Sequence, residues 1–340
     1  MSRTLGLVLV TLALLAAVAA PVLAPHATDA HFGGLLNAPP TVVHLADASG
    51  GWHAPFIHRW RLVSQLEQRY EEDVSTRVPV AWFSGGHLVQ SSDDVAAPLL
   101  LLGADSYGRD VFTRLLFGAR TSLGLAVTAA LGALLIGASI GGLAGFAGGM
   151  FDDVLMRAAD FVMVLPAIYV ALALRAVLPL VLTASEVFGL LASIFAIVGA
   201  PFVARGVRAI VRSERRLDYA VAAEALGASD ARLLFRHLLP SARGFMAVQM
   251  TLLIPAFIVA EATLSYVGLG FPDPVASWGT MLHDASSNIR VFAEFPWLLS
   301  PAAAMFFVVL GVNLVLQNRT SEDVRHIDVR HIGVRHTQRL

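Results

Sequence analysis

Long apolar runs alternate with short polar stretches in this chain, and they constrain its fold more than any other feature. The runs cover residues 5–23, 123–146, 161–182, 187–204, 245–268 and 297–316. Each is long enough to cross the hydrocarbon core of a bilayer as an α-helix, which takes about 17–25 residues. Only 14% of the residues are charged, against about 25% in an average soluble domain. The sequence therefore predicts an all-α integral membrane protein with about six transmembrane helices.

The charged residues exclude several kinds of chemistry. All 24 basic residues are Arg, so the chain has no Lys for a nucleotide-binding P-loop. It has no Cys, which excludes disulfides, thiolate metal sites and cysteine nucleophiles. Its net charge of −1 predicts no nucleic-acid partner. We predict no catalytic residue, no metal and no cofactor, and any ATP must be bound by another chain.

The sequence divides into four parts. Residues 1–24 form the first predicted span, 25–101 an insert, 102–318 the remaining helices and 319–340 a tail. Arg3 precedes the first run and favours a cytoplasmic N-terminus. A cleaved signal peptide is the alternative for this run, because Ala-rich sequence follows it.

The insert, residues 25–101, differs in composition from the rest of the chain. Short β-like runs lie at residues 41–45 and 78–83, and the pairs Gly50-Gly51 and Gly85-Gly86 indicate turns. We expect a small external domain here, with a partly ordered spacer as the alternative.

The next segment, residues 102–122, places apolar residues at helical spacing from Asp110 onward, with Arg114 and Arg120 between them. This pattern predicts an interfacial amphipathic helix before the second span. Within that span glycines recur every four residues, which predicts close helix packing or dimerisation. The glycines are Gly137, Gly141, Gly145 and Gly149.

Polar residues lie before, within and after the third and fourth spans. Asp152, Asp153 and Arg157 predict a short polar connection, and Arg175 lies inside the third span. Pro166 and Pro179 predict kinks in that span. Five arginines follow the fourth span and predict a cytoplasmic loop. They are Arg205, Arg208, Arg212, Arg215 and Arg216.

Residues 217–240 form a polar island between two apolar runs. Residues 220–226 are strong helix formers, and Gly227 then ends the helical pattern. Ser229 or Asp230 can cap a second helix over residues 231–238, which Pro240 closes. The pattern predicts a short helix, a glycine turn and a second short helix, although an ordinary cytoplasmic loop is an alternative.

Two further features lie near the C-terminus. Glu261 is an ionisable residue inside the fifth apolar run, so it should face the bundle interior and be paired or protonated. Trp278 and Trp297 suit the membrane interface. The tail repeats His326, His331 and His336 at a spacing that matches neither a strand nor one helical face. We interpret it as a solvated tail without function, with metal binding by the histidines as the alternative.

Three motifs resemble those of binding-protein-dependent ABC importer permeases of the dipeptide, oligopeptide and nickel branch. The first is the EAA loop, although Val221 stands at the usual Glu position and Glu224 follows three residues later. The second is the LGTDxxGRD signature before the second span. The third combines AExSLSFLGLG, at residues 261–270, with SWGxML, at residues 277–282. The residues that match the loop are Tyr219, Ala222, Ala223, Glu224, Gly227, Ala228, Ser229 and Pro240. The residues that match the signature are Gly103, Asp105, Gly108, Arg109 and Asp110.

The resemblance implies an inner-membrane permease subunit with both termini in the cytoplasm. Its expected partners are a second permease, two ABC ATPase subunits, an external substrate-binding protein and the lipid bilayer. In that family the EAA loop forms coupling helices that dock into a cleft of the ATPase. The expected substrate is a di- or oligopeptide, with nickel chelates and other small solutes left open. From the residues alone, a proton-coupled secondary transporter using Glu261 is the alternative.

Overall fold

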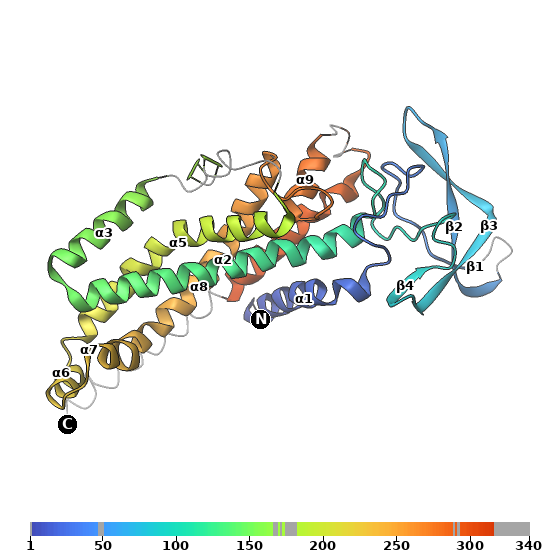
Figure 1. The fold of residues 1–340 in the computed structure, drawn as a ribbon. Coiled ribbons are helices and arrows are strands. Elements are labelled where there is room, and N and C mark those ends of the chain that lie inside the picture. Colours follow the sequence, from blue (N-terminus) through green and yellow to red (C-terminus); the bar gives the residue numbers. More distant parts are fainter. Residues whose placement is uncertain are drawn as a thin grey trace, which may run out of the picture.

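The computed structural model describes residues 2–46, 51–165, 169–170, 172–173, 182–287, 290 and 293–315. Five helices within these ranges are long and apolar enough to cross a membrane. Four of them correspond to α1 (Ser2–Leu23), α2 (Val111–Ala147), α5 (Ala184–Glu214) and α8 (Arg243–Tyr266). The fifth is Pro296–Val315. The long helices lie side by side, with a small sheet at one end and α6 (Asp218–Ala225) at the other (Figure 1). The predicted all-α class is confirmed.

The second span is longer than the sequence predicted. The separate interfacial helix expected from Asp110 is wrong, because α2 runs without a break from Val111 to Ala147. Asp110 caps its N-terminus by accepting hydrogen bonds from the backbone N–H groups of Phe112 and Thr113. Arg114 is fully buried within the protein, so an interfacial position does not account for its charge.

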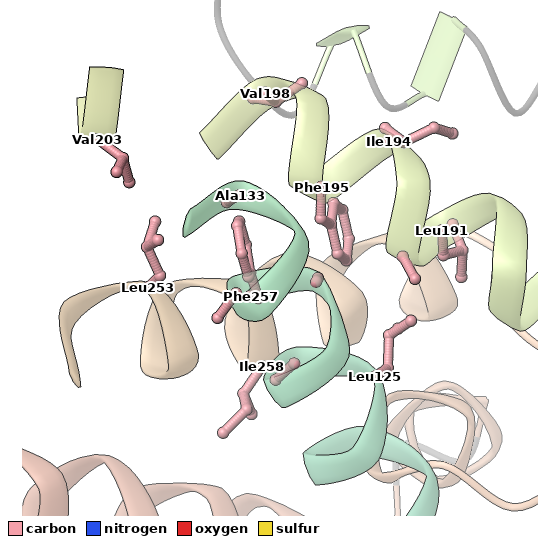
Figure 2. Packing of buried hydrophobic residues seen from close by; sticks show 14 of the residues in the cluster. Leu125, Ala133, Leu191, Ile194, Phe195, Val198, Val203, Leu253, Phe257 and Ile258 are labelled. Carbon is pink, nitrogen blue, oxygen red and sulfur yellow. The ribbon is translucent and has the colours of Figure 1, made fainter. Parts of the chain in front are cut away.

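Close packing of α2 against α5 forms the centre of the bundle. An added Cβ at Gly137 would lie 2.6 Å from Ala200 O, and one at Gly145 would lie 2.6 Å from Arg208 O. The four-residue glycine spacing up to Gly145 therefore serves packing within the chain. Leu253, Phe257 and Ile258 of α8 complete this core, where Phe195 and Phe257 stack at 5.4 Å between ring centroids (Figure 2).

The polar segments beside the third and fourth spans are helical. Asp152 and Asp153 lie in α3 (Gly149–Val164), so the polar connection predicted there is wrong. Arg205, Arg208 and Arg212 lie on α5, which extends ten residues beyond the predicted end of the fourth span at residue 204. Arg is a strong helix former, so the helix continues through these arginines, and the ion pair of Asp152 with Arg208 joins α3 to α5.

Parts of the third span and of the tail lie outside the described residues. This holds for Pro166, Arg175, Pro179 and the repeated histidines of the tail. The span Pro296–Val315 packs against α1, where a Cβ at Gly6 would lie 2.7 Å from Gly311 O. Trp278 begins α9 (Trp278–Ser286) and is 2% exposed, so the predicted interfacial position of this residue is wrong.

The insert forms an antiparallel sheet of four strands in the order β1-β2-β3-β4. The strands are β1 (His44–Ala46), β2 (Trp52–Ser64), β3 (Arg69–Ser84) and β4 (His87–Ser91). Gly85 and Gly86, with φ of 60° and 88°, form the two-residue turn between β3 and β4. The turn prediction at this pair is confirmed, whereas the β-like run at 41–45 overlaps β1 in only two residues. Since the described part of the insert is folded, the spacer alternative is wrong for it.

Candidate functional site

Residues 217–240 lie at the end of the bundle opposite the sheet (Figure 1). Helix α6 ends at Ala225, Leu226 is its C-cap residue, and Gly227 follows with φ of 84°. Ala228 N donates to Ala223 O at 3.0 Å, and Gly227 N donates to Glu224 O at 2.9 Å. These two bonds are the Schellman pattern, which satisfies the last carbonyls of a helix through a residue in the left-handed conformation. Gly227 therefore ends the first short helix as predicted.

The second half of the segment begins with a side-chain cap. Ser229 Oγ accepts a hydrogen bond from Arg232 N and starts α7 (Asp230–Arg232). A π-helical turn, Leu233–Leu238, and a 3-10 turn, Leu239–Ala242, then lead into α8. Pro240 does not close the helix as predicted. The wider π turn before it accommodates a residue that has no N–H and whose ring crowds the preceding turn.

One side of this segment is anchored in the bundle and the other is exposed. Ala220, Leu233, Leu234 and Leu238 are buried in the same core cluster as the end of α5. Five large apolar or aromatic side chains remain exposed, and we call them the apolar end surface. They are Leu217, Tyr219, Val221, Leu226 and Phe235. Leu226 is 89% exposed, so this anchored segment has large apolar side chains that the rest of the chain does not cover.

The other residues matched to the loop motif lie around this surface. Ala222 and Glu224 are exposed, while Ala223 and Ala228 are half-buried. Val221 is also exposed, one helical turn before Glu224. Tyr219 donates a hydrogen bond from its hydroxyl to Glu214 Oε2 at 2.6 Å, and burial raises the pKa of this phenol to about 12.

A second cluster lies at the opposite end, before α2. Arg109 is buried and donates from Nε to Asp105 Oδ2 at 2.7 Å. It also donates to Asp273 Oδ1 at 3.0 Å and to Asp284 Oδ2 at 2.6 Å. Burial lowers the pKa of Arg109, but these three carboxylates outweigh burial and raise it above its usual value. Arg109 therefore joins one carboxylate of its own turn to two carboxylates from distant parts of the chain.

Gly103 and Gly108 hold the turn that presents this cluster. Their φ values are 73° and 74°, and an added Cβ at Gly103 would lie 2.6 Å from Ala38 O. At Gly108 the Cβ would press against Phe32 O. Both positions therefore require glycine for conformation and for space.

Asp110 has a partner that the sequence did not indicate. Its Oδ2 lies 3.0 Å from Nδ1 of the buried His26, whose Nε2 lies 2.9 Å from Asp94 Oδ1. Burial lowers the pKa of His26, but hydrogen bonds to the two carboxylates raise it to about 9. His26 is therefore protonated at neutral pH and ties the end of α1 to the start of α2. It lies 84 residues from Asp110, so no local pattern could have revealed the pair.

Glu261 lies in the interior of the bundle, as predicted. It is 1% exposed and accepts hydrogen bonds from three serine hydroxyls at 2.6–2.9 Å. The donors are Ser122 on α2, Ser265 on α8 and Ser277 before α9. Ser122 Oγ also accepts from Trp278 N at 3.1 Å. The carboxyl group thus joins three elements at one point.

Residues 137–318 match a known family. The model of the binding-protein-dependent transport system inner membrane component matches residues 137–318, more than half of the chain. This chain belongs to that family. The family consists of ABC importer permeases. The chain is therefore a membrane-embedded permease subunit and is not itself the ATPase.

Curated relatives agree with the family. The oligopeptide transport system permease protein OppC of Bacillus subtilis is 41% identical over 216 residues, 63% of this permease and 67% of that protein. The dipeptide transport system permease protein DppC of Alkalihalophilus pseudofirmus is 37% identical, covering 63% and 67%. The glutathione transport system permease protein GsiD of Pectobacterium atrosepticum is 35% identical, covering 63% and 68%. These similarities do not support the alternative of a proton-coupled secondary transporter.

We expect that Glu261→Gln in this permease retains ATP-dependent uptake within a few-fold. The amide oxygen can still accept from Ser265 and Ser277, and the amide nitrogen can donate to Ser122. Glu261→Leu removes the acceptor of three buried hydroxyl donors, and a buried donor left without its acceptor costs about 1–3 kcal/mol. Uptake and thermal stability of both variants should be measured together. A complete loss of uptake in stable Glu261→Gln protein would show that the carboxylate itself is needed.

Proposed function

We propose that this chain is a permease subunit of an ATP-driven importer for di- or oligopeptides. The single observation that supports the assignment best is the apolar end surface, held on a helix–glycine–helix segment at one end of a membrane bundle. The relatives reported above are named for transport of oligopeptides, dipeptides and glutathione, and all three kinds of solute are peptides. Nickel chelates and other small solutes remain alternative substrates.

The apolar end surface is the proposed ATPase-docking site. Its exposed aromatic and aliphatic side chains suit a hydrophobic cleft on a partner protein, where such residues contribute most of the binding energy. Leu233, Leu234 and Leu238 anchor the same segment in the bundle core. A displacement at the ATPase is therefore transmitted to α2 and α5 and is not absorbed by a loose loop.

The complete importer requires further chains. The family implies an ATPase and a substrate-binding protein as partners. We propose a second permease subunit, two ATPase subunits and one external binding protein. ATP hydrolysis takes place on the ATPase chains, because this chain lacks the lysine of a P-loop. ATP binding drives transport by favouring one orientation of the permease over the other.

The proposed topology has six spans, the sheet outside and both termini in the cytoplasm. The five arginines from Arg205 to Arg216 directly precede residues 217–240 in the sequence, and such clusters are retained on the cytoplasmic side. A reporter fused after Gly86 should therefore read external and one after Ser229 cytoplasmic. Alkaline phosphatase and green fluorescent protein fusions at both sites provide the measurement. Two fusions that report the same compartment would contradict this topology.

Reconstitution tests the function directly. The chain, its partner permease, the ATPase subunits and the binding protein should be placed in proteoliposomes with radiolabelled dipeptide or oligopeptide. We expect uptake with ATP and none with a non-hydrolysable analogue. Uptake driven by a proton gradient without ATP would contradict the assignment, and ATP-dependent uptake of nickel chelate alone would change only the substrate.

A further inference from the structure

The turn between β3 and β4 lies beside the end of the first membrane span. His87, which follows the Gly85–Gly86 turn, bonds through Nδ1 to Ala24 O at 2.6 Å. Figure 1 shows β4 next to the C-terminal end of α1. This hydrogen bond places the β3–β4 turn next to the residue that follows α1, so the position of the turn relative to the membrane depends on where α1 ends.

Helix α1 marks where the bilayer surface lies. Its 22 residues are about 33 Å long at 1.5 Å per residue, close to the roughly 30 Å of a bilayer hydrocarbon core. The C-terminal end of α1 therefore lies at one bilayer surface. Ala24 follows directly, so the β3–β4 turn lies at the level of the lipid headgroups, on whichever side of the membrane that surface faces.

Two aromatic side chains project from this turn. Phe83 is 81% exposed and Trp82 is 57% exposed. Consecutive residues of a regular strand point to opposite faces, but Phe83 has φ of 51°, which interrupts the strand geometry. An aromatic residue in this left-handed region is uncommon.

Charge distinguishes this turn from the other end of the sheet. Residues 78–92 contain no Asp, Glu or Arg. Residues 59–73, around the turn between β2 and β3, include seven charged residues, and Leu66 at this turn is 90% exposed. These seven are Arg59, Arg61, Glu67, Arg69, Glu71, Glu72 and Asp73. The β2–β3 turn also touches the helical part of the chain, where Arg290 donates to Leu66 O and Glu67 O. The two turns therefore differ in charge, and the β3–β4 turn is the uncharged, aromatic one that meets the end of α1.

We propose that the β3–β4 turn is a lipid-binding element, in which Phe83 and Trp82 insert into the headgroup region of the bilayer. Aromatic side chains are enriched at this depth because one part of the environment is apolar and another is hydrated. The turn thereby sets the sheet at a defined height over the end of α1. The proposal rests on membrane insertion of the chain and is independent of the peptide substrate.

Site-directed spin labelling tests the proposal, since the chain has no cysteine of its own. Phe83→Cys and Trp82→Cys are each labelled with a nitroxide, with Leu66→Cys as the matched control. The full chain is then reconstituted with its partner subunits in phosphatidylethanolamine and phosphatidylglycerol vesicles. Oxygen, which concentrates in lipid, should relax the labels at positions 82 and 83 more strongly than a water-soluble nickel chelate does. The label at position 66 should show the reverse.

Two results would overturn the proposal. A label at position 83 that the nickel chelate reaches as readily as it reaches position 66 would place the turn in water. A label shielded from both reagents would show that a protein partner covers the turn. Because Phe83→Cys also changes a residue with positive φ, Trp82→Cys provides an independent reading on ordinary strand backbone.

Discussion

Gly227→Val should abolish ATP hydrolysis stimulated by substrate and the uptake that depends on it, with membrane levels near those of the parent chain. A Cβ at position 227 would meet no atom within 4 Å, so the effect arises from the backbone alone. The φ of 84° is strained for valine, at a cost of about 1–3 kcal/mol. Relief of that strain changes the angle between α6 and the following helix, and with it the shape of the apolar end surface.

Gly244→Val is the matched control for this prediction. Gly244 lies in α8, and an added Cβ there also meets no atom within 4 Å, but its φ is in the ordinary helical range. We expect it to transport like the parent. Glu224→Ala should be mild, because Val221 already stands at the position where the family has Glu. Uptake and ATPase co-purification should be measured on the same preparations. If Gly227→Val binds the ATPase and transports normally, residues 217–240 are not the coupling element.

Arg109→Ala should prevent stable folding of the permease. The substitution leaves Asp105, Asp273 and Asp284 converging without the cation that each contacts at 3.0 Å or less. Arg114 is the nearest remaining cation, 3.8 Å from Asp105 and from Asp284. Removing one partner of a buried ion pair costs about 3–5 kcal/mol, a large fraction of the 5–15 kcal/mol that stabilises a typical protein. Membrane level and melting temperature in detergent provide the measurement.

Two further variants, Arg109→Lys and Asp273→Asn, test how much the geometry of the arginine and one carboxylate contribute to the stability of the protein. Lysine keeps the charge but replaces a planar fork of donors with a single point charge, so its loss of stability should be intermediate. Asp273→Asn should be the mildest change, since that carboxylate is 78% exposed. An Arg109→Ala protein as stable as the parent would mean that the cluster does not hold the α8–α9 connection against α2.

Local patterns in the sequence predicted the elements whose geometry depends on near neighbours. The Gly227 turn, the Ser229 cap and the Gly85–Gly86 hairpin each depend on residues within a few positions, and all three were predicted. The interior position of Glu261 followed from one carboxylate in an apolar run. The family resemblance was confirmed. The assignment of roles to its motif residues, including the coupling role of residues 217–240, stays a prediction.

Long-range contacts could not be predicted from spacing. Asp273 and Asp284 lie 164 and 175 residues from Arg109, and neither stands in a pattern that points to it. The same limit explains the incorrect boundaries. Arg114 marked a helix surface in the sequence, but it is buried inside a continuous α2, 3.8 Å from Asp105 and from the distant Asp284. The ion pair of Arg208 with Asp152 of α3 is likewise a contact that spacing did not reveal.

The glycine-lined contact between α2 and α5 has a mechanical consequence. Because the backbones of the two helices are in contact, we expect α2 and α5 to bend less than a single helix does and to move as one rigid unit. Helix α2 has 37 residues and is about 55 Å long, which exceeds the roughly 30 Å hydrocarbon core. In the importer proposed here, a displacement of the end of α2 that extends beyond the hydrocarbon core is transmitted along the helix to the opposite face of the membrane. A state with closed ATP sites and an unmoved permease should therefore not accumulate during the transport cycle.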